Sequence, residues 1–194
     1  MEDPIKQETL LLEAVNILLE TINELPMEDE SEYDGFLEAK QARSKIIEVT
    51  RAVLGEKWDF NTDKNYIFPL DANNMIPIGT NVLNVVGNRG DVIMRNWKLY
   101  SRKNQSHIFE EEVPCDVVWL FDFNNLTHPL RHYITIRAAR IFAARTIGDK
   151  EIITFNEIDE EDARLAARRS ESLTGKYNML SSGMYGINNS ARMN

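Results

Sequence analysis

The chain has 194 residues, of which 43% are hydrophobic and 27% charged, and its formal net charge is −9. This length fits one domain, or one domain with a substantial insertion, and the composition is ordinary for a globular protein. No apolar run approaches the roughly 20 residues of a membrane helix, and the acidic start Met-Glu-Asp-Pro lacks the basic region of a signal peptide. The sequence therefore predicts a globular protein that is made and assembled in a cytoplasm, without a membrane partner.

Acidic residues concentrate at the N-terminal end. Residues 1–40 hold twelve acids against Lys6 and Lys40, a balance of −10, which leaves +1 for the other 154 residues. DNA affinity requires clustered Lys and Arg, so this end is not expected to grip DNA. It is interpreted either as a solvated acidic face or as a surface that repels DNA or meets a basic partner.

Two helices are predicted in the first 55 residues. Apolar residues spaced four and three apart from Leu11 to Leu25 indicate a helix that begins near Thr9, and Pro26 ends it. After an acidic loop, a second amphipathic helix is expected over residues 35–54, with Gly55 as its C-terminal cap.

The period changes after the second helix. Residues 58–123 are rich in Val, Ile and aromatic residues and are interrupted by Pro, Gly and Asn, which is typical of short strands and turns. Candidate strands cover residues 66–70, 75–78, 82–86, 92–100, 107–111 and 116–121. Gly87 and Gly90 are expected to supply the positive φ angles of a hairpin turn. This part is predicted to be a small antiparallel β-region.

Helical periodicity returns after Asn124. One helix is predicted from Pro129 to Gly148, and another over residues 157–173, with Gly175 ending it. Residues 177–194 have no amphipathic stripe and are expected to order only against a neighbour.

The predicted fold class is α+β: an antiparallel four-helix bundle, a small antiparallel β-region inserted between helices two and three, and an extended C-terminal arm. The expected divisions are a discontinuous helical bundle domain over residues 1–55 and 125–176, an inserted β-rich domain over 56–124, and the arm over 177–194.

Motifs of common active sites are absent from the sequence. It has no phosphate-binding loop, dinucleotide-binding turn or nucleophile elbow. His128 and His132 are four residues apart, but Pro129 stands where a metalloprotease motif has Glu, so they are interpreted as histidines at a helix start. Cys115 is interpreted as a small buried hydrophobe and not as a reactive thiol.

Adjacent acids, Glu110 with Glu111 and the run 159–162, could serve a glycosidase only if two of them faced each other across a sugar. The run lies at a helix start, where acids are favoured electrostatically. The letters Arg-Gly-Asp at residues 89–91 are interpreted as coincidence within a turn. No enzyme activity, cofactor or metal is therefore predicted.

The last two predicted helices are rich in arginine: Arg131, Arg137, Arg140 and Arg145 in one, and Arg164, Arg168 and Arg169 in the other. Two interpretations remain open. The arginines neutralise the acidic first helices within one chain, or they do so between copies, in a head-to-tail contact that closes into a ring.

Four short motifs, in this order, resemble the tail tubular protein A family of short-tailed bacteriophages, also called the adaptor or gatekeeper. They are Ala14-Val15-Asn16-Ile17-Leu18, Trp58-Asp59-Phe60-Asn61, Arg137-Ala138-Ala139-Arg140 and Tyr177-Asn178-Met179-Leu180. The chain departs from the family at Lys57, where the family often has Gly, and the β-region matches poorly.

The resemblance implies a structural virion protein of the tail, a head-tail connector that forms a twelve-fold ring of identical subunits beneath the portal. The tail nozzle, tail tubular protein B, would lie below it, tail fibres would attach around the joint, and DNA would pass through the channel without specific binding during genome ejection. The expected partner-binding residues are Tyr177, Met179 and Leu180 on the arm, and Arg137, Arg140, Arg164 and Arg168 on the helices.

Two other hypotheses stay open from the sequence. The first is a tail-associated polysaccharide hydrolase, which would need two acids in one cleft. The second is a regulatory helical module that binds host proteins through an exposed apolar groove.

Overall fold

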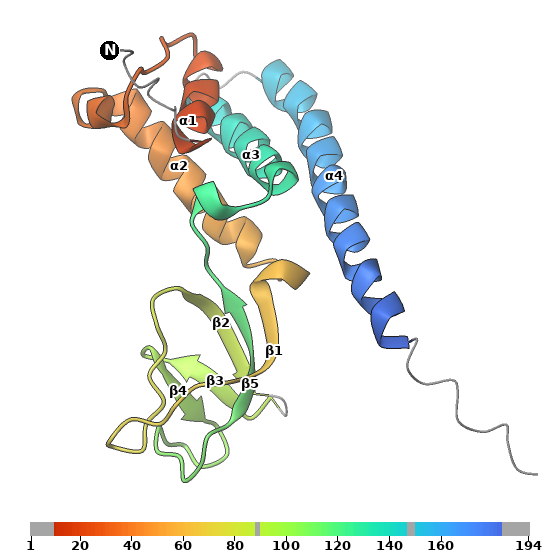
Figure 1. Ribbon diagram of the computed structural model, residues 1–194. Helices are drawn as coiled ribbons and strands as arrows, with labels where there is room; N and C mark the ends of the chain where they lie inside the picture. Colours follow the sequence, from red (N-terminus) through yellow and green to blue (C-terminus); the bar gives the residue numbers. More distant parts are fainter. Residues whose placement is uncertain (1–9, 88–89, 147–149, 184–194) are drawn as a thin grey trace, which may run out of the picture.

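The computed structural model describes residues 10–87, 90–146 and 150–183, without the side chains of residues 34, 150–156 and 174–183 (Figure 1). Within these ranges the helices are α1 (Leu10–Glu20), α2 (Leu37–Leu54), α3 (His128–Thr146) and α4 (Lys150–Gly183), with the short 3₁₀ helices η1 (Glu30–Gly35), η2 (Asp59–Asn61) and η3 (Phe123–Asn125). The strands are β1 (Thr62–Ile67), β2 (Val82–Gly87), β3 (Val92–Arg95), β4 (Lys98–Ser101) and β5 (Pro114–Trp119). No described helix is long and apolar enough to cross a membrane.

The prediction of a four-helix bundle with an inserted β-region is wrong. Helices α1, α2 and α3 pack on one another, whereas α4 packs along α3 and makes no comparable contact with α1 or α2. Figure 1 shows α4 at the side of the group, running down to the level of the sheet. The physical reason lies in its inner face, where Ala163 and Ala167 are the buried side chains among those described for α4. Such a narrow stripe can cover one neighbouring helix but cannot close a bundle.

The C-terminal boundary also differs from the prediction. Gly175 does not end α4, which continues to Gly183, because a glycine inside a helix costs only about 1 kcal/mol and does not forbid the conformation. Residues 177–183, predicted as part of an extended arm, are therefore helical. Residues 184–194 lie outside the described part of the chain.

Two hydrophobic clusters form the interior. One lies among α1, α2 and α3 and includes Trp58 and Phe123 from the connections to the sheet. The other lies within the sheet and includes Leu99, Cys115 and Val117. The sheet is antiparallel, with the strand order β1-β5-β2-β3-β4. The last strand in sequence, β5, therefore lies between β1 and β2 and pairs with both.

The strands of the sheet differ from the predicted ones at the hairpin between β3 and β4. The predicted strand 92–100 is two strands, because Asn96 and Trp97 both take positive φ angles, 52° and 56°, as in the tight turn that best suits a two-residue hairpin. The predicted strands 75–78 and 107–111 contribute only isolated bridges, such as that between Met75 and Ile108. No glycine marks this turn, so the sequence pattern missed it.

Of the two glycines expected in the β2–β3 turn, only Gly90 has a positive φ, of 70°. Gly87 instead lies in β2, close to β3. A Cβ atom at this position would be 2.8 Å from the Cβ of Val92. The absence of a side chain at Gly87 therefore allows β2 and β3 to approach each other closely.

Replacing Gly87 with Ala is expected to lower the free energy of unfolding by about 1 to 3 kcal/mol, because the strands must separate to accept the methyl group. The control is Gly35→Ala, where a Cβ atom would meet nothing within 4 Å and the change should stay within about 0.5 kcal/mol. Urea unfolding followed by circular dichroism measures both. Equal effects would contradict the proposed crowding at Gly87.

Candidate functional site at the joint between the helices and the sheet

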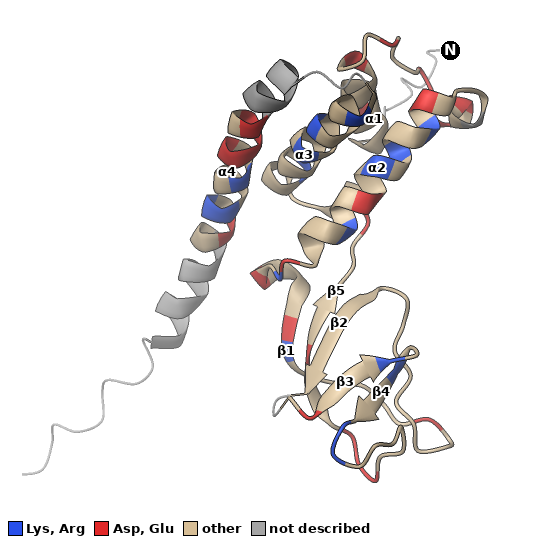
Figure 2. Cartoon of the chain, turned by 180° about the vertical axis from the view of Figure 1, so that it is seen from behind, with Lys and Arg blue, Asp and Glu red and all other residues tan. Residues whose placement is uncertain are grey.

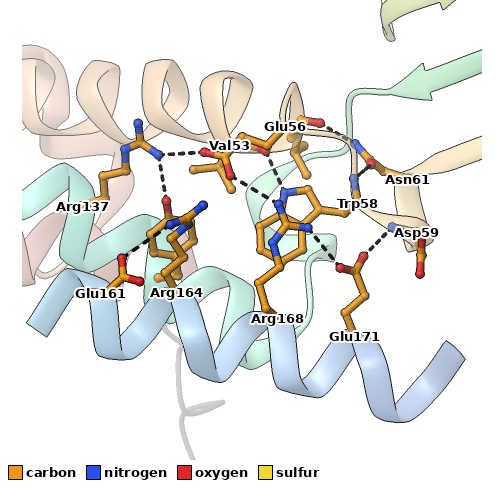
Figure 3. A network of polar contacts seen from close by, with 12 residues as sticks. Val53, Glu56, Trp58, Asp59, Asn61, Arg137, Glu161, Arg164, Arg168 and Glu171 are labelled. Atoms are coloured by element: carbon orange, nitrogen blue, oxygen red, sulfur yellow. Dashed lines mark hydrogen bonds and ion pairs between the residues drawn. The ribbon is translucent and has the colours of Figure 1, made fainter. Parts of the chain in front are cut away.

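Residues 55–61, the joint loop, connect α2 to β1 where α2, α4 and the sheet meet (Figure 3). Gly55 caps α2 in the right-handed region, at φ −66°, and Lys57 then takes a positive φ of 62°. The chain turns there and places the Trp58 ring in the helical cluster, with 1% of the residue exposed. The indole Nε1 donates to the carbonyl of Val53 at 2.7 Å. The loop is thus folded back on the end of α2.

Asn61 joins three parts of the chain. Asn61 is completely buried. Its Oδ1 accepts a hydrogen bond from the backbone N–H of Trp58 at 3.0 Å, and its Nδ2 donates to the carbonyls of Leu54 at 3.0 Å and Trp119 at 2.9 Å. Only an amide side chain offers one acceptor and two donors in this geometry. Asn61 therefore ties the end of α2, the joint loop and β5 together.

Arg168 connects α4 to the joint loop. Its guanidinium carbon lies 3.6 Å from the centre of the Trp58 ring, a cation–π contact. The guanidinium also lies 3.5 Å from a carboxylate oxygen of Glu56 and 3.2 Å from one of Glu171. Glu171 in turn accepts a hydrogen bond from the backbone N–H of Asp59. Figure 3 shows these contacts along one side of α4.

Arg137 on α3 completes the network. It donates to Glu56 at 2.9 Å and to the hydroxyl oxygen of Tyr133 at 2.8 Å, and it lies 3.6 Å from Glu160 on α4. Burial raises the pKa of the Tyr133 hydroxyl, so this group stays neutral at physiological pH. Glu56 is thus shared by Arg137 and Arg168, one from each of the two packed helices.

The remaining predicted arginines differ in their environment. Arg140 pairs with Glu160 and, at 3.7 Å, with Glu157, both on α4. Among the described residues, Arg164 pairs only with the exposed Glu161, one turn away on the same helix, at 3.5 Å. Arg137, Arg140 and Arg168 therefore have acidic partners inside the chain, supplied by α4 and by Glu56. Their role in binding another copy stays a prediction.

The predicted anchors Tyr177, Met179 and Leu180 lie on the last turns of α4. Their side chains are outside the described part of the structure, so their binding role also stays a prediction.

The other candidate chemical groups are not assembled into a reactive site in the described residues. His128 and His132 stack on the first turns of α3, with ring centres 6.4 Å apart, and no described group of three His, Cys, Asp or Glu could hold a metal ion. Glu110 and Glu111 are exposed and line an open hollow on the sheet. The Arg-Gly-Asp letters cannot be placed, because Arg89 lies outside the described residues.

The interpretation of Cys115 as a buried hydrophobe is confirmed. The residue has no exposed surface, and burial raises the pKa of its thiol to about 11. The thiol is therefore protonated and shielded at neutral pH, and it does not act as a nucleophile.

The sequence did not identify Glu56 and Asn61 as the residues that connect the elements at the joint loop. Asn61 belongs to the Trp-Asp-Phe-Asn motif, which marked the position but not its bonds. Glu56 carried no signal at all, because its partners Arg137 and Arg168 are 81 and 112 residues away.

The buried amide and the ion pairs of the joint loop position helices and strands and connect the two hydrophobic clusters. Comparison with known families gives the identity of the chain: a model described as tail tubular protein matches residues 12–177. The match covers most of the chain, so the protein belongs to the tail tubular protein family and is a structural protein of a phage tail. No curated protein matches the chain.

Replacing Asn61 with Ala should lower the free energy of unfolding by about 2 to 4 kcal/mol, because the buried N–H of Trp58 loses its acceptor and the carbonyls of Leu54 and Trp119 each lose a donor. Asn84→Ala, at an exposed position of β2, is the matched control and should be nearly neutral. Thermal unfolding measures both. A small effect at Asn61 would show that water replaces the lost bonds.

Arg168→Ala should destabilise the protein by about 1 to 2 kcal/mol, since it removes the contact with the Trp58 ring and the ion pairs with Glu56 and Glu171. Arg164→Ala, one turn earlier on α4, should change stability by less than about 0.5 kcal/mol, because its single pair is exposed. Hydrogen exchange of the α4 amides should rise in the first variant alone. Equal exchange in the two variants would exclude Arg168 as the attachment of α4.

Proposed function

We propose that this protein is the ring-forming adaptor between the portal and the tail nozzle of a short-tailed phage. The observation that carries the proposal is the family match over residues 12–177. The proposed assembly is a dodecamer docked beneath the portal, with the nozzle protein below it and tail fibres attached around the joint. It forms in the host cytoplasm and becomes part of the virion.

The internal structure of the subunit supports this role. A connector must carry load between two neighbours, so its parts need a fixed relative position. Asn61 bonds the end of α2 to β5, and Arg168 holds α4 against the joint loop. The helical and sheet clusters can then contact different partners while staying in one arrangement.

The charge of the chain supports passage of DNA through the ring. With a net charge of −9, the subunit carries no excess of Lys and Arg that would hold phosphates. Figure 2 shows acidic and basic residues interspersed along the described parts of the helices. A wall of this kind lets the polyanion slide without a strong attraction. We assign the protein no catalytic step and no cofactor.

Purified protein mixed with portal rings should form a complex with twelve copies of this chain per portal, measured by mass photometry and by the symmetry in electron microscopy. Tyr177→Ala/Met179→Ala/Leu180→Ala should weaken portal binding, because it removes the apolar anchors at the end of α4. Asn84→Ala, at an exposed position of β2 outside the predicted binding residues, is the control with wild-type binding. Persistent monomers that never bind the portal would overturn the adaptor proposal.

A further inference from the structure

The outer side of α4 carries an apolar stripe. Ile158, Leu165 and Leu173 are 65%, 42% and 67% exposed, and they lie on the side of the helix away from Ala163 and Ala167, which pack inward. Their spacing of seven and eight residues places them along one face. Large apolar side chains aligned on an exposed helix face indicate a contact with another protein surface.

Acidic residues accompany the first half of this stripe. Asp162 lies between Ile158 and Leu165 on the same face, and Asp159 lies beside it. Both acids are exposed, and neither makes an ion pair with a residue that the structure describes. Figure 2 shows the acidic turns of α4 in red. The surface that fits this face is therefore apolar and basic.

Such a surface lies between α2 and α3. A groove of about 520 Å³ there is lined by Leu37, Ser44 and Phe142, with Lys40 and Arg145 among its basic residues. Leu37 is 64% exposed although it is large and apolar. Most of the charge in the groove is basic, since Glu48 is its only acidic lining residue and is engaged by the neighbouring Lys45.

The groove is not covered by the α4 of the same chain, which packs along α3 and makes no comparable contact with α2. Figure 1 shows that α2 and α4 both run from the outer end of the helical group toward the sheet. Rotation about an axis along the helices keeps this direction, so α4 of one copy can lie parallel to α2 of the next. The two surfaces differ, and a contact between them is head-to-tail, the kind that closes into a ring.

We propose that α4 of one copy docks into the α2–α3 groove of the next copy, with Ile158 and Leu165 against the apolar lining and Asp159 and Asp162 facing Lys40 and Arg145. This inference rests on the proposed ring and names its interface. The apolar side chains supply most of the affinity, and the charges fix the orientation and exclude other pairings.

Charge reversal tests the interface. Asp159→Lys/Asp162→Lys and Lys40→Glu/Arg145→Glu should each lower the yield of rings on the portal at least tenfold, because like charges then face each other at every contact. An equimolar mixture of the two variants should restore the rings, since alternating copies again pair opposite charges. Glu111→Lys/Glu112→Lys makes the same charge change on the sheet and is the control.

The outcomes separate the two proposals. Wild-type rings together with unaffected reversal variants would overturn the interface and leave the adaptor function standing. Wild-type protein that forms no ring with the portal would overturn both. Circular dichroism of each variant verifies that a loss of assembly is not a loss of folding.

Cysteine cross-linking gives a second test in the assembled ring. Leu37→Cys and Ile158→Cys, mixed as single variants, should form a disulfide-linked species of twice the chain mass, which can arise only between copies. Each variant alone should not, because in a head-to-tail contact like positions do not meet. The native Cys115 is buried and stays unreactive. Cross-linking of Ile158→Cys with itself would overturn the head-to-tail arrangement.

Discussion

The buried amide of Asn61 holds the end of α2, the Trp58 backbone and β5 in one arrangement, because it supplies an acceptor and two donors to groups that have lost their contact with water. The two hydrophobic clusters lie on either side of this joint. Arg168 then contacts two residues of the same loop, the face of the buried Trp58 ring and the Glu56 carboxylate, and so attaches α4. The position of the fourth helix therefore depends on the folding of a loop from the other half of the sequence.

Helix α4 is held mainly by polar contacts and small side chains. Ala163 and Ala167 allow a close approach to α3, and Glu160 pairs with two arginines of that helix. The large apolar residues Ile158, Leu165 and Leu173 are exposed and are therefore not needed for this attachment. These residues lie on the outer side, where another subunit can use them, and this division of roles suits a protein whose work consists of contacts.

The arginines show how charge is distributed between folding and assembly. The sequence left open whether they act within a chain or between copies. Arg137, Arg140 and Arg168 have acidic partners within the chain, whereas Asp159 and Asp162 on α4 have no such partner among the described residues. In the proposed ring, the acids of α4 and the basic groove between α2 and α3 carry the recognition. In this proposal the acidic residues of the interface come from α4 and the basic residues from the groove between α2 and α3. The sequence suggested the reverse, with acidic residues from the first helices and basic residues from the last ones.

The sequence by itself determined the local elements: the helices near residues 37–54 and 128–146, the antiparallel strands between them, the burial of Cys115 and, through its motifs, the tail tubular protein family. Tertiary structure decided that α4 stands beside α3 outside any bundle, and that Asn61 and Glu56 are central. Periodicity reports which side of a helix is apolar but not which neighbour covers it, and the bonds of Asn61 and Glu56 join residues up to 112 positions apart. Contacts over such separations exist only once the chain is folded.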